Sequence, residues 1–233
     1  MRGILVAIDG PAASGKSTTA RKVAERLGYC HMNSGLLYRS IAWIALRDGW
    51  IDEPVEFGAE LERLDLAMER RFPEFAVRAG GEVPGKQLLA APETARRASE
   101  VAAVREVRDR VLGILRANGK EGGVTCDGRD IGTVVFPTAE LKIFLVATAD
   151  ERARRRLLER ERDPHGPELA AEVRSLQERD LRDTNRSLAP LVRASDAIEI
   201  DTTELSPDEV VNRIVCLALE RGAEAVDGSR DSA

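Results

Sequence analysis

A glycine-rich stretch near the N-terminus constrains the fold of this chain more than any other feature. It reads Gly10-Pro11-Ala12-Ala13-Ser14-Gly15-Lys16-Ser17, and Thr18 follows. A short apolar run at Ile4–Ile8 precedes it, and Ser17–Leu27 carries apolar residues at helical spacing. Two glycines at this spacing before Lys-Ser, between a strand and a helix, match the loop that wraps phosphate groups with backbone N–H groups. The sequence therefore predicts a phosphate-binding turn at the end of a buried strand.

This loop supplies the first candidate site residues. We expect every residue from Gly10 to Thr18 to take part in binding a nucleotide, with the N-terminus of the following helix adding the positive end of a dipole. Lys16 is also a candidate catalytic residue, because its ammonium group can bridge the outer phosphates. Ser17 is the candidate ligand of Mg²⁺, and Thr18 is a candidate contact of the α-phosphate.

Strands and helices alternate along the rest of the chain. Further strands are predicted at Tyr29–Met32, Val124–Asp127, Leu141–Val146 and Ala197–Asp201, and helices at Gly35–Arg47, Thr94–Ala117, from Thr148 through Arg162, at Glu168–Asn185 and after Ser206. This alternation predicts an α/β fold of the P-loop NTPase type, in which helices flank a parallel sheet. Ligands of such a fold lie at the carboxyl ends of the strands.

One stretch interrupts the alternation. Prolines and glycines punctuate the residues after Asp48, and short strands are predicted at Leu64–Arg70 and Phe75–Arg78. We therefore expect a small inserted antiparallel unit at 49–92. The core is expected to comprise 1–48 and 93–222, with a helical lid at 151–187, and the tail at 223–233 is expected to be disordered.

Composition argues against several classes of protein. The net charge of −5 and the lack of a long basic block do not suit a protein that binds nucleic acid polymers. No apolar run approaches the roughly 20 residues that span a bilayer, and the N-terminal run resembles a core strand more than a signal peptide. Cys30, Cys126 and Cys216 are scattered, which favours reduced thiols. We therefore expect a cytoplasmic protein that has no membrane or nucleic acid partner.

A nucleotide-binding loop alone leaves several functional classes open. The chain has no Asn-Lys-x-Asp motif for recognising guanine, which argues against a GTP-dependent switch. It also has no Ser-Gly-Gly signature, which argues against an ABC-type ATPase. A kinase for a small acceptor needs a second anion site and an arginine-bearing lid. Candidates for that second site are Ser34, Tyr38 and Arg39, then Arg129 and Asp130, and finally Arg179, Asp183 and Arg186, whose spacing places them on one helix face. The arginine-rich helix at 151–162 is the candidate lid.

These motifs resemble those of the bacterial cytidylate kinase family, within the nucleoside monophosphate kinases. The likeness runs from Ile4 to Leu219 and rests on Asp9-Gly10-Pro11, on Asn33-Ser34-Gly35 with Tyr38-Arg39, on Asp127-Gly128-Arg129-Asp130 followed by Gly132-Thr133-Val134-Val135-Phe136-Pro137, and on Glu178-Arg179-Asp180 with Asp183, Asn185 and Arg186. Two departures are visible. Asn33 stands where the family often has Asp, and the lid matches poorly, so the roles of individual lid arginines stay open.

The resemblance implies a reversible transfer of the ATP γ-phosphate to CMP or dCMP, with Mg²⁺. It implies that Ser34, Ser99, Arg108 and Asp130 contact the cytosine, that Arg39, Arg129 and Arg186 hold the acceptor phosphate, and that Arg179 and Asp183 face the ribose. Tyr38 belongs to the same substrate site, and Arg129 and Arg186 join Lys16 as candidate catalytic residues. The inserted unit resembles the monophosphate-binding unit of this family. We expect a monomer.

Two alternatives remain open. The first is a P-loop kinase for another small acceptor, such as UMP, AMP or shikimate. The second is a regulatory protein that binds ATP without transferring its phosphate. A panel of acceptors would separate the first alternative, and release of ADP that depends on an acceptor would exclude the second.

Overall fold

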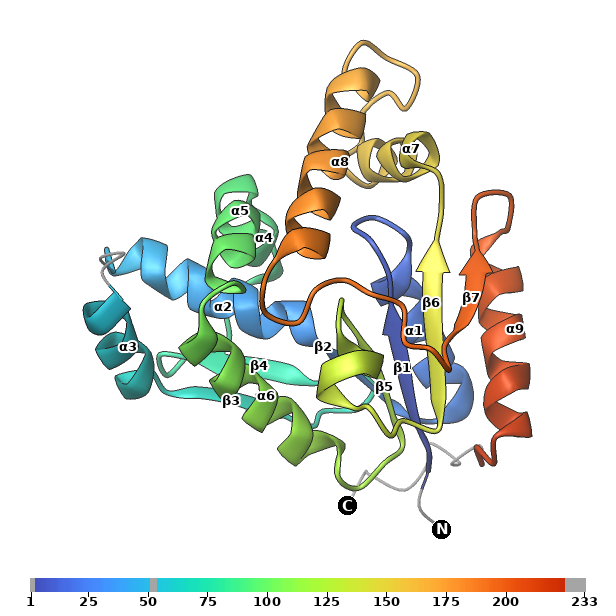
Figure 1. Ribbon diagram of the computed structural model, residues 1–233, viewed down its shortest axis with the longest axis horizontal. Helices are drawn as coiled ribbons and strands as arrows, with labels where there is room; N and C mark the ends of the chain where they lie inside the picture. Colours follow the sequence, from blue (N-terminus) through green and yellow to red (C-terminus); the bar gives the residue numbers. More distant parts are fainter. Residues whose placement is uncertain (1–2, 51–53, 225–233) are drawn as a thin grey trace.

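The computed structural model describes residues 3–50 and 54–224 (Figure 1). Its centre is a five-stranded sheet in which all neighbouring strands are parallel. The strands are β1 (Leu5–Asp9), β2 (Cys30–Asn33), β5 (Val124–Asp127), β6 (Leu141–Val146) and β7 (Ile198–Asp201), in the order β2-β5-β1-β6-β7. The predicted α/β fold with a parallel sheet is therefore confirmed.

Helices cover both faces of the sheet (Figure 1). The helices α1 (Lys16–Leu27) and α9 (Pro207–Glu220) pack on one face, and α2 (Ser34–Arg47) and α6 (Arg105–Gly119) pack on the other. Local sequence marks their ends. Gly28 ends α1 in the left-handed region, with φ of 67°, and a reciprocal capping box between Ser206 and Glu209 begins α9.

The central strand β1 supplies both apolar cores. Leu5 and Ala7 belong to the core beneath α2 and α6, whereas Val6 and Ile8 belong to the core beneath α1 and α9. Alternate side chains of a strand point to opposite faces, so an apolar strand at the centre of a sheet is buried on both. This burial fixes the register of β1 and therefore the point at which the phosphate loop leaves the sheet.

The inserted stretch contains the expected antiparallel pair and also two helices. The strands β3 (Leu66–Glu69) and β4 (Ala76–Ala79) pair antiparallel, close to the predicted ranges. The helices α3 (Pro54–Arg63) and α4 (Lys86–Ala90) are absent from the prediction. Phe57, Leu61 and Leu64 are buried and lie at helical spacing, so the sequence does contain a signal for α3. Prolines and glycines nearby obscure it.

The predicted single helix at Thr94–Ala117 is wrong. The chain forms α5 (Pro92–Val101) and α6, separated by residues 102–104. The N–H groups of Ala103 and Val104 donate only three residues back, to Glu100 and Val101, and Val104 is extended with φ of −80° and ψ of 127°. This break lets α5 turn Ser99 toward the cavity described below while α6 brings Arg108 to Asp130.

Two further helices stand above the carboxyl ends of the strands (Figure 1). They are α7 (Ala149–Glu159) and α8 (Leu169–Asn185), and they pack against each other. Thr148 caps α7 as predicted, but the helix ends before the predicted Arg162, because Glu161 adopts a left-handed φ of 57°. Across residues 3–50 and 54–224, no helix combines the length and the apolar character that crossing a membrane requires.

Candidate active site

The phosphate loop joins β1 to α1 in a conformation that the sheet imposes. Gly10 has φ of 148°, and a Cβ atom there would lie 2.1 Å from the carbonyl oxygen of Leu145 on β6. Ala13 has a left-handed φ of 58°, which is strained for alanine and of the kind that functional sites retain. Only a loop of this composition can turn so close to the strand ends and aim its N–H groups at a phosphate.

Lys16 lies inside this loop. Its side chain is buried, and its ammonium donates to the Pro11 carbonyl and, at 3.2 Å, to the Ser14 hydroxyl. Burial lowers the pKa of Lys16 well below its usual value, and the nearby charge of Arg129 lowers it further. An ammonium group in these surroundings gains most when an anion enters the loop.

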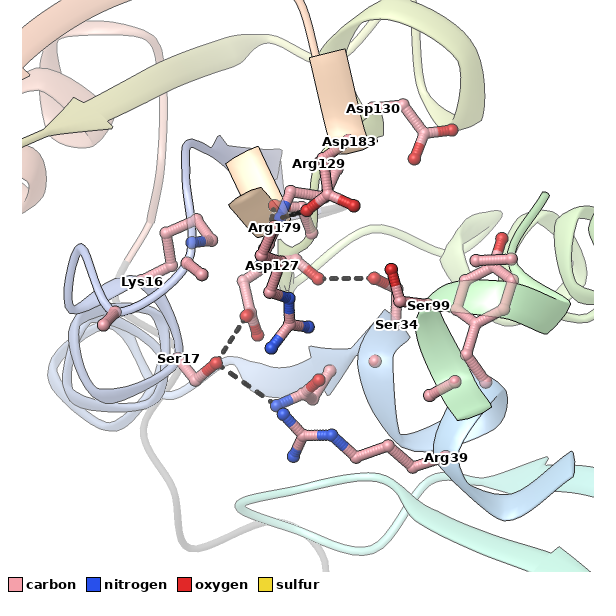
Figure 2. Close-up of a pocket in the computed structure, with 18 of the residues that line it drawn as sticks. Lys16, Ser17, Ser34, Arg39, Ser99, Asp127, Arg129, Asp130, Arg179 and Asp183 are labelled. Atoms are coloured by element: carbon pink, nitrogen blue, oxygen red, sulfur yellow. Dashed lines mark hydrogen bonds and ion pairs between the residues drawn. The ribbon is translucent and has the colours of Figure 1, made fainter. Parts of the chain in front are cut away.

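The hydroxyl of Ser17 lies at the carboxyl ends of β2 and β5 (Figure 2). It donates to Oδ2 of Asp127 at 2.6 Å and accepts from Nδ2 of Asn33 at 3.3 Å. Asn33 occupies the N-cap position of α2 but does not cap the helix with its side chain. Hydroxyl and carboxylate oxygens are ligands that Mg²⁺ prefers, so this group fits the metal predicted at Ser17.

Asp127 has no individual role in the sequence prediction, yet it connects the phosphate loop to β2. Its Oδ1 lies 2.7 Å from Nε2 of His31. Burial raises the pKa of Asp127, but the hydrogen bonds from His31 and Ser17 outweigh burial and hold the pKa below its usual value. Asp127 is therefore a buried, ionised carboxylate. Its place as the last residue of a predicted parallel strand was the available signal.

One cavity of about 360 Å³ extends from the phosphate loop to α2, α5, α8 and the segment after β5. The predicted site residues that line it are Ala12, Ala13, Gly15, Lys16, Ser17, Thr18, Ser34, Tyr38, Arg39, Ser99, Arg129, Asp130, Arg179, Asp183 and Arg186. Gly10, Pro11 and Ser14 do not line it, and Arg108 lines a neighbouring cavity that shares Tyr38. Lining residues without a predicted individual role are Asn33, Gly35, Ala98, Ala102, Asp127, Gly128, Arg156 and Glu159.

Asp130 is held between two arginines. One oxygen pairs with Arg108, and the other lies 3.3 Å from Nη2 of Arg186. Tyr38 lies nearby, and burial raises the pKa of its hydroxyl to about 12, so this hydroxyl remains a neutral donor. The wall of the cavity at this point offers a fixed carboxylate whose orientation does not depend on a ligand.

Asp183 pairs across the site rather than along its own helix. Its Oδ2 lies 2.9 Å from Nε of Arg129, which follows β5, and no ion pair joins it to Arg179 or Arg186 in the described chain (Figure 2). The spacing of these α8 residues does place all three on the cavity. The intrahelical pair considered from the sequence is therefore replaced by a contact between α8 and the end of β5.

Two arginines of the cavity have no partner. Within the described ranges, neither Arg39 nor Arg179 makes a hydrogen bond or an ion pair, and both side chains point toward the interior of the cavity (Figure 2). Burial and the nearby charge of Arg129 lower the pKa of both groups, that of Arg179 to about 10. Two partly buried, unpaired guanidinium groups that also repel a third define an anion-binding position.

Asp9, at the end of β1, anchors the segment that carries Arg129 and Asp130. Its two carboxylate oxygens accept the N–H groups of Ile131 at 2.8 Å and Gly132 at 2.7 Å, at the start of a short π-helix. Burial raises the pKa of Asp9 to about 6, although the two backbone donors oppose the shift. The sequence prediction used this residue only as part of a motif.

The helices α7 and α8 both contact the phosphate loop. Asp180 on α8 accepts the Ala12 N–H at 3.2 Å and pairs with Arg152 on α7 at 2.6 Å, while Arg152 donates to the Ala12 carbonyl at 3.0 Å. Among the arginines of α7, Arg156 lines the cavity, and it is paired with Glu172 at 3.1 Å. The prediction could not single out one lid arginine, because the choice depends on how α7 packs on α8.

These features define a P-loop kinase. A phosphate loop lies at the edge of a parallel sheet, unpaired guanidinium groups face it across one cavity, and two arginine-bearing helices contact it. The family model described as "Cytidylate kinase" matches residues 6–220. The chain belongs to the cytidylate kinase family, as its motifs suggested.

Curated relatives agree with this family along nearly the whole chain. The cytidylate kinase of Limosilactobacillus fermentum is 42% identical over 92% of this chain and 95% of its own length. That of Pseudomonas fluorescens is 43% identical over 91% of this chain and 93% of its own length. That of Desulfitobacterium hafniense is 40% identical over 93% of each. The likeness therefore extends over more than nine tenths of this chain in each case.

Proposed function

We propose that this protein transfers the γ-phosphate of ATP to CMP and dCMP, with Mg²⁺, as the enzymes of its family are named for doing. One observation carries the proposal: the phosphate loop and the unpaired Arg39 and Arg179 line the same cavity. Such a cavity can bind one nucleotide through the loop and a second, anionic nucleotide beside the arginines. A protein that only bound ATP would not need the second anion position.

The donor side of the cavity is proposed to hold ATP. The loop N–H groups wrap the phosphates, and the ammonium of Lys16 moves from its loop carbonyl to the β- and γ-phosphates. Mg²⁺, when bound, neutralises charge on the β- and γ-phosphate oxygens. Ser17 would hold it directly, and Asp127 would act from behind through its 2.6 Å bond to Ser17.

The acceptor phosphate is proposed to lie between Arg39 and the end of β5. Arg39 is free to bind it, and Arg129 and Arg186 can share it with the carboxylates that already fix them. Such fixed forks place an acceptor oxygen against the γ-phosphorus at little cost in ordering. Because that oxygen already belongs to an anionic phosphate, the transfer requires no strong general base.

Selection of cytosine is proposed to rest on Asp130. Its carboxylate, fixed by Arg108 and Arg186, can accept a hydrogen bond from the exocyclic amino group of cytosine. Uracil has a carbonyl oxygen at this position, which is itself an acceptor and cannot donate to the carboxylate. Ser34 and Ser99 line the same region and can complete the contacts to the base. Arg179 and Asp183 are proposed to face the sugar, which leaves room for both ribose and deoxyribose.

The lid is proposed to move over the bound nucleotides and exclude water. We infer that residues 151–187 form this lid, that residues 49–92 form the monophosphate-binding unit, and that Arg156 approaches the transferring group. Exclusion of water would limit hydrolysis of ATP when the acceptor is absent. We also propose that the protein acts as a monomer in the cytoplasm on free nucleotides.

A panel of acceptors tests the proposal. CMP, dCMP, UMP, AMP and shikimate are supplied at equal concentration with MgATP, and formation of ADP and of each phosphorylated product is measured. We expect CMP and dCMP to have the highest kcat/KM. Equal or faster use of UMP, AMP or shikimate would support the alternative kinase, and ATP binding without any acceptor-dependent ADP would support the regulatory protein.

A further inference from the structure

His31 does not line the cavity, but it is hydrogen-bonded to Asp127, which does. It lies on β2, is 4% exposed, and its Nε2 is 2.7 Å from Oδ1 of Asp127. The backbone of His31 is held as well. Its N–H donates to the Pro73 carbonyl at 2.8 Å, and its carbonyl accepts the Phe75 N–H at 2.9 Å. Neither the backbone nor the ring is free to reorient.

The surroundings of the ring decide which nitrogen carries the hydrogen. Oδ1 of Asp127 lies 2.7 Å from Nε2 of His31, so we assign the hydrogen of this bond to Nε2, which donates it to the carboxylate. The other nitrogen, Nδ1, is buried and has no hydrogen-bond partner in the described chain. The bond from Nε2 to Asp127 is therefore the one that fixes the ring.

This bond leaves one oxygen of Asp127 for the nucleotide site. Oδ1 is occupied by His31, so Oδ2 is directed at the Ser17 hydroxyl, 2.6 Å away. Asp127 is itself buried, with 3% exposure. Without a donor at Oδ1, the carboxylate would keep an unpaired buried oxygen and would gain by turning away from Ser17.

We propose that His31 is a positioning residue for the Mg²⁺-bound nucleotide. Its Nε2–H fixes Asp127 so that Oδ2 orients the Ser17 hydroxyl toward a divalent cation brought in with the phosphates. A hydrogen-bonded partner behind a carboxylate commonly tunes a metal site in this way. The inference rests on the proposed use of a metal-bound nucleotide, but not on the identity of the acceptor.

Two variants in which the side chain at position 31 has a similar length test the inference. His31→Gln places an amide N–H where Nε2 lies, whereas His31→Met fills a similar volume without a donor. Met32→Leu is the matched control, because Met32 is fully buried beside His31 on β2 and the change conserves volume. The affinity for a non-hydrolysable ATP analogue is measured by calorimetry with and without Mg²⁺, in the absence of acceptor.

We expect His31→Met to lose about tenfold of the affinity that Mg²⁺ adds, with the metal-free affinity unchanged. His31→Gln and Met32→Leu should both retain the wild-type response to Mg²⁺. A folded His31→Met variant with a wild-type response would overturn the inference. An equal loss with and without Mg²⁺ would also overturn it, since it would mean a merely structural role.

A measurement on the unmodified protein keeps the test decisive if His31→Met does not fold. In protein labelled with ¹⁵N-histidine, the Nε2–H of His31 should give an exchange-protected proton resonance, assigned against the exposed His165 with a His165→Gln variant. This resonance should shift with the Mg²⁺-bound analogue more than with the metal-free analogue. Identical shifts would contradict the inference. All these binding measurements omit the acceptor, so failure of the acceptor panel would leave them interpretable.

Discussion

At the scale of single residues, the site is organised by which charged groups already have a partner. Asp130 and Asp183 each fix arginines that line or adjoin the cavity, whereas Arg39 and Arg179 have no partner within the described chain. Paired groups keep their orientation in the absence of ligand, and unpaired groups lose repulsion when an anion enters. The cavity is therefore ordered in its walls and short of negative charge at its centre.

Lys16→Ala should lower kcat with CMP by on the order of a hundredfold to a thousandfold, because a fixed positive charge next to the transferring phosphoryl group is lost. Steady-state kinetics and circular dichroism check the activity and the fold. Lys22→Ala is the matched control, since Lys22 lies on the same helix and pairs with Asp208 at the surface at 3.0 Å. A loss confined to KM would contradict the assigned role.

Asp183→Ala should lower kcat/KM for CMP and dCMP about tenfold to a hundredfold. The proposed hydrogen bond from the sugar to the Asp183 carboxylate involves a charged group, and such a bond contributes about 1.5–3 kcal/mol. Removing this carboxylate also leaves Arg129 without its partner. ATP affinity without acceptor should change little, because the phosphate loop makes no contact with Asp183. Arg182→Ala, exposed on the same helix, is the control. Unchanged kinetics with only a lower melting temperature would leave Asp183 a structural residue.

At the scale of elements, the important contacts join segments that are far apart in the chain. The helix α8 holds the Ala12 N–H through Asp180, and α7 holds the Ala12 carbonyl through Arg152. The two helices therefore meet at one residue of the phosphate loop. A movement of either helix would therefore displace the loop groups that bind the phosphates.

Asp180→Ala should weaken ATP binding about tenfold, since the loop loses one anchor and Arg152 loses its carboxylate partner. Calorimetric titration with an ATP analogue measures the dissociation constant, and thermal melting measures stability. The control is Glu178→Ala, an exposed residue two positions earlier on α8. If both variants bind the analogue equally well, the contacts that Asp180 makes with the loop and with Arg152 have no role in ATP binding.

At the scale of the whole molecule, the sheet places the site at one edge by burying its strands on both faces. β1 lies between two apolar cores, and the polar residues that end β1, β2 and β5 gather at the same edge. Burial near this edge also has an energetic cost. The clearest case is Asp9, whose carboxylate is enclosed while it anchors Ile131 and Gly132.

The stability of the fold should record this cost. Burial raises the pKa of Asp9 from 3.8 to about 6. Between these values the folded chain keeps a proton that the unfolded chain releases, so the contribution of Asp9 to stability falls as pH rises through this window. Well above pH 6 the group is ionised in both states, and the contribution is constant.

Chemical unfolding of the wild type and of Asp9→Asn at pH 4.5 and pH 7 measures this contribution. The unfolding free energy of the wild type minus that of the variant should decrease by about 2 kcal/mol from the lower to the higher pH. The subtraction removes the effect of the other carboxylates, whose titration is common to both proteins. A difference that stays constant or increases with pH would contradict the raised pKa.

Features that depend on near neighbours in the chain could be predicted from the sequence. The strands Val124–Asp127 and Leu141–Val146 are found at their predicted bounds, and the phosphate loop, the antiparallel pair and the Ser206 cap are present. Branched apolar runs, glycines with left-handed backbone and capping residues act over a few positions. The motifs after these strands likewise identified the cytidylate kinase family and brought most of the candidate residues to one cavity.

Tertiary packing sets the division of Thr94–Ala117 into two helices and the partners of the charged residues, and neither could be predicted from the sequence. Helical periodicity continues through residues 102–104. Both helices contact α2, but α5 also packs on α4, whereas α6 also packs on α3 and β3. Arg129 and Asp183 are 54 positions apart, and His31 and Asp127 are 96 apart. The first pair joins the end of β5 to α8 and the second joins β2 to β5, so both form only after the chain has folded. No local sequence preference distinguishes these residues from the many other polar and charged residues.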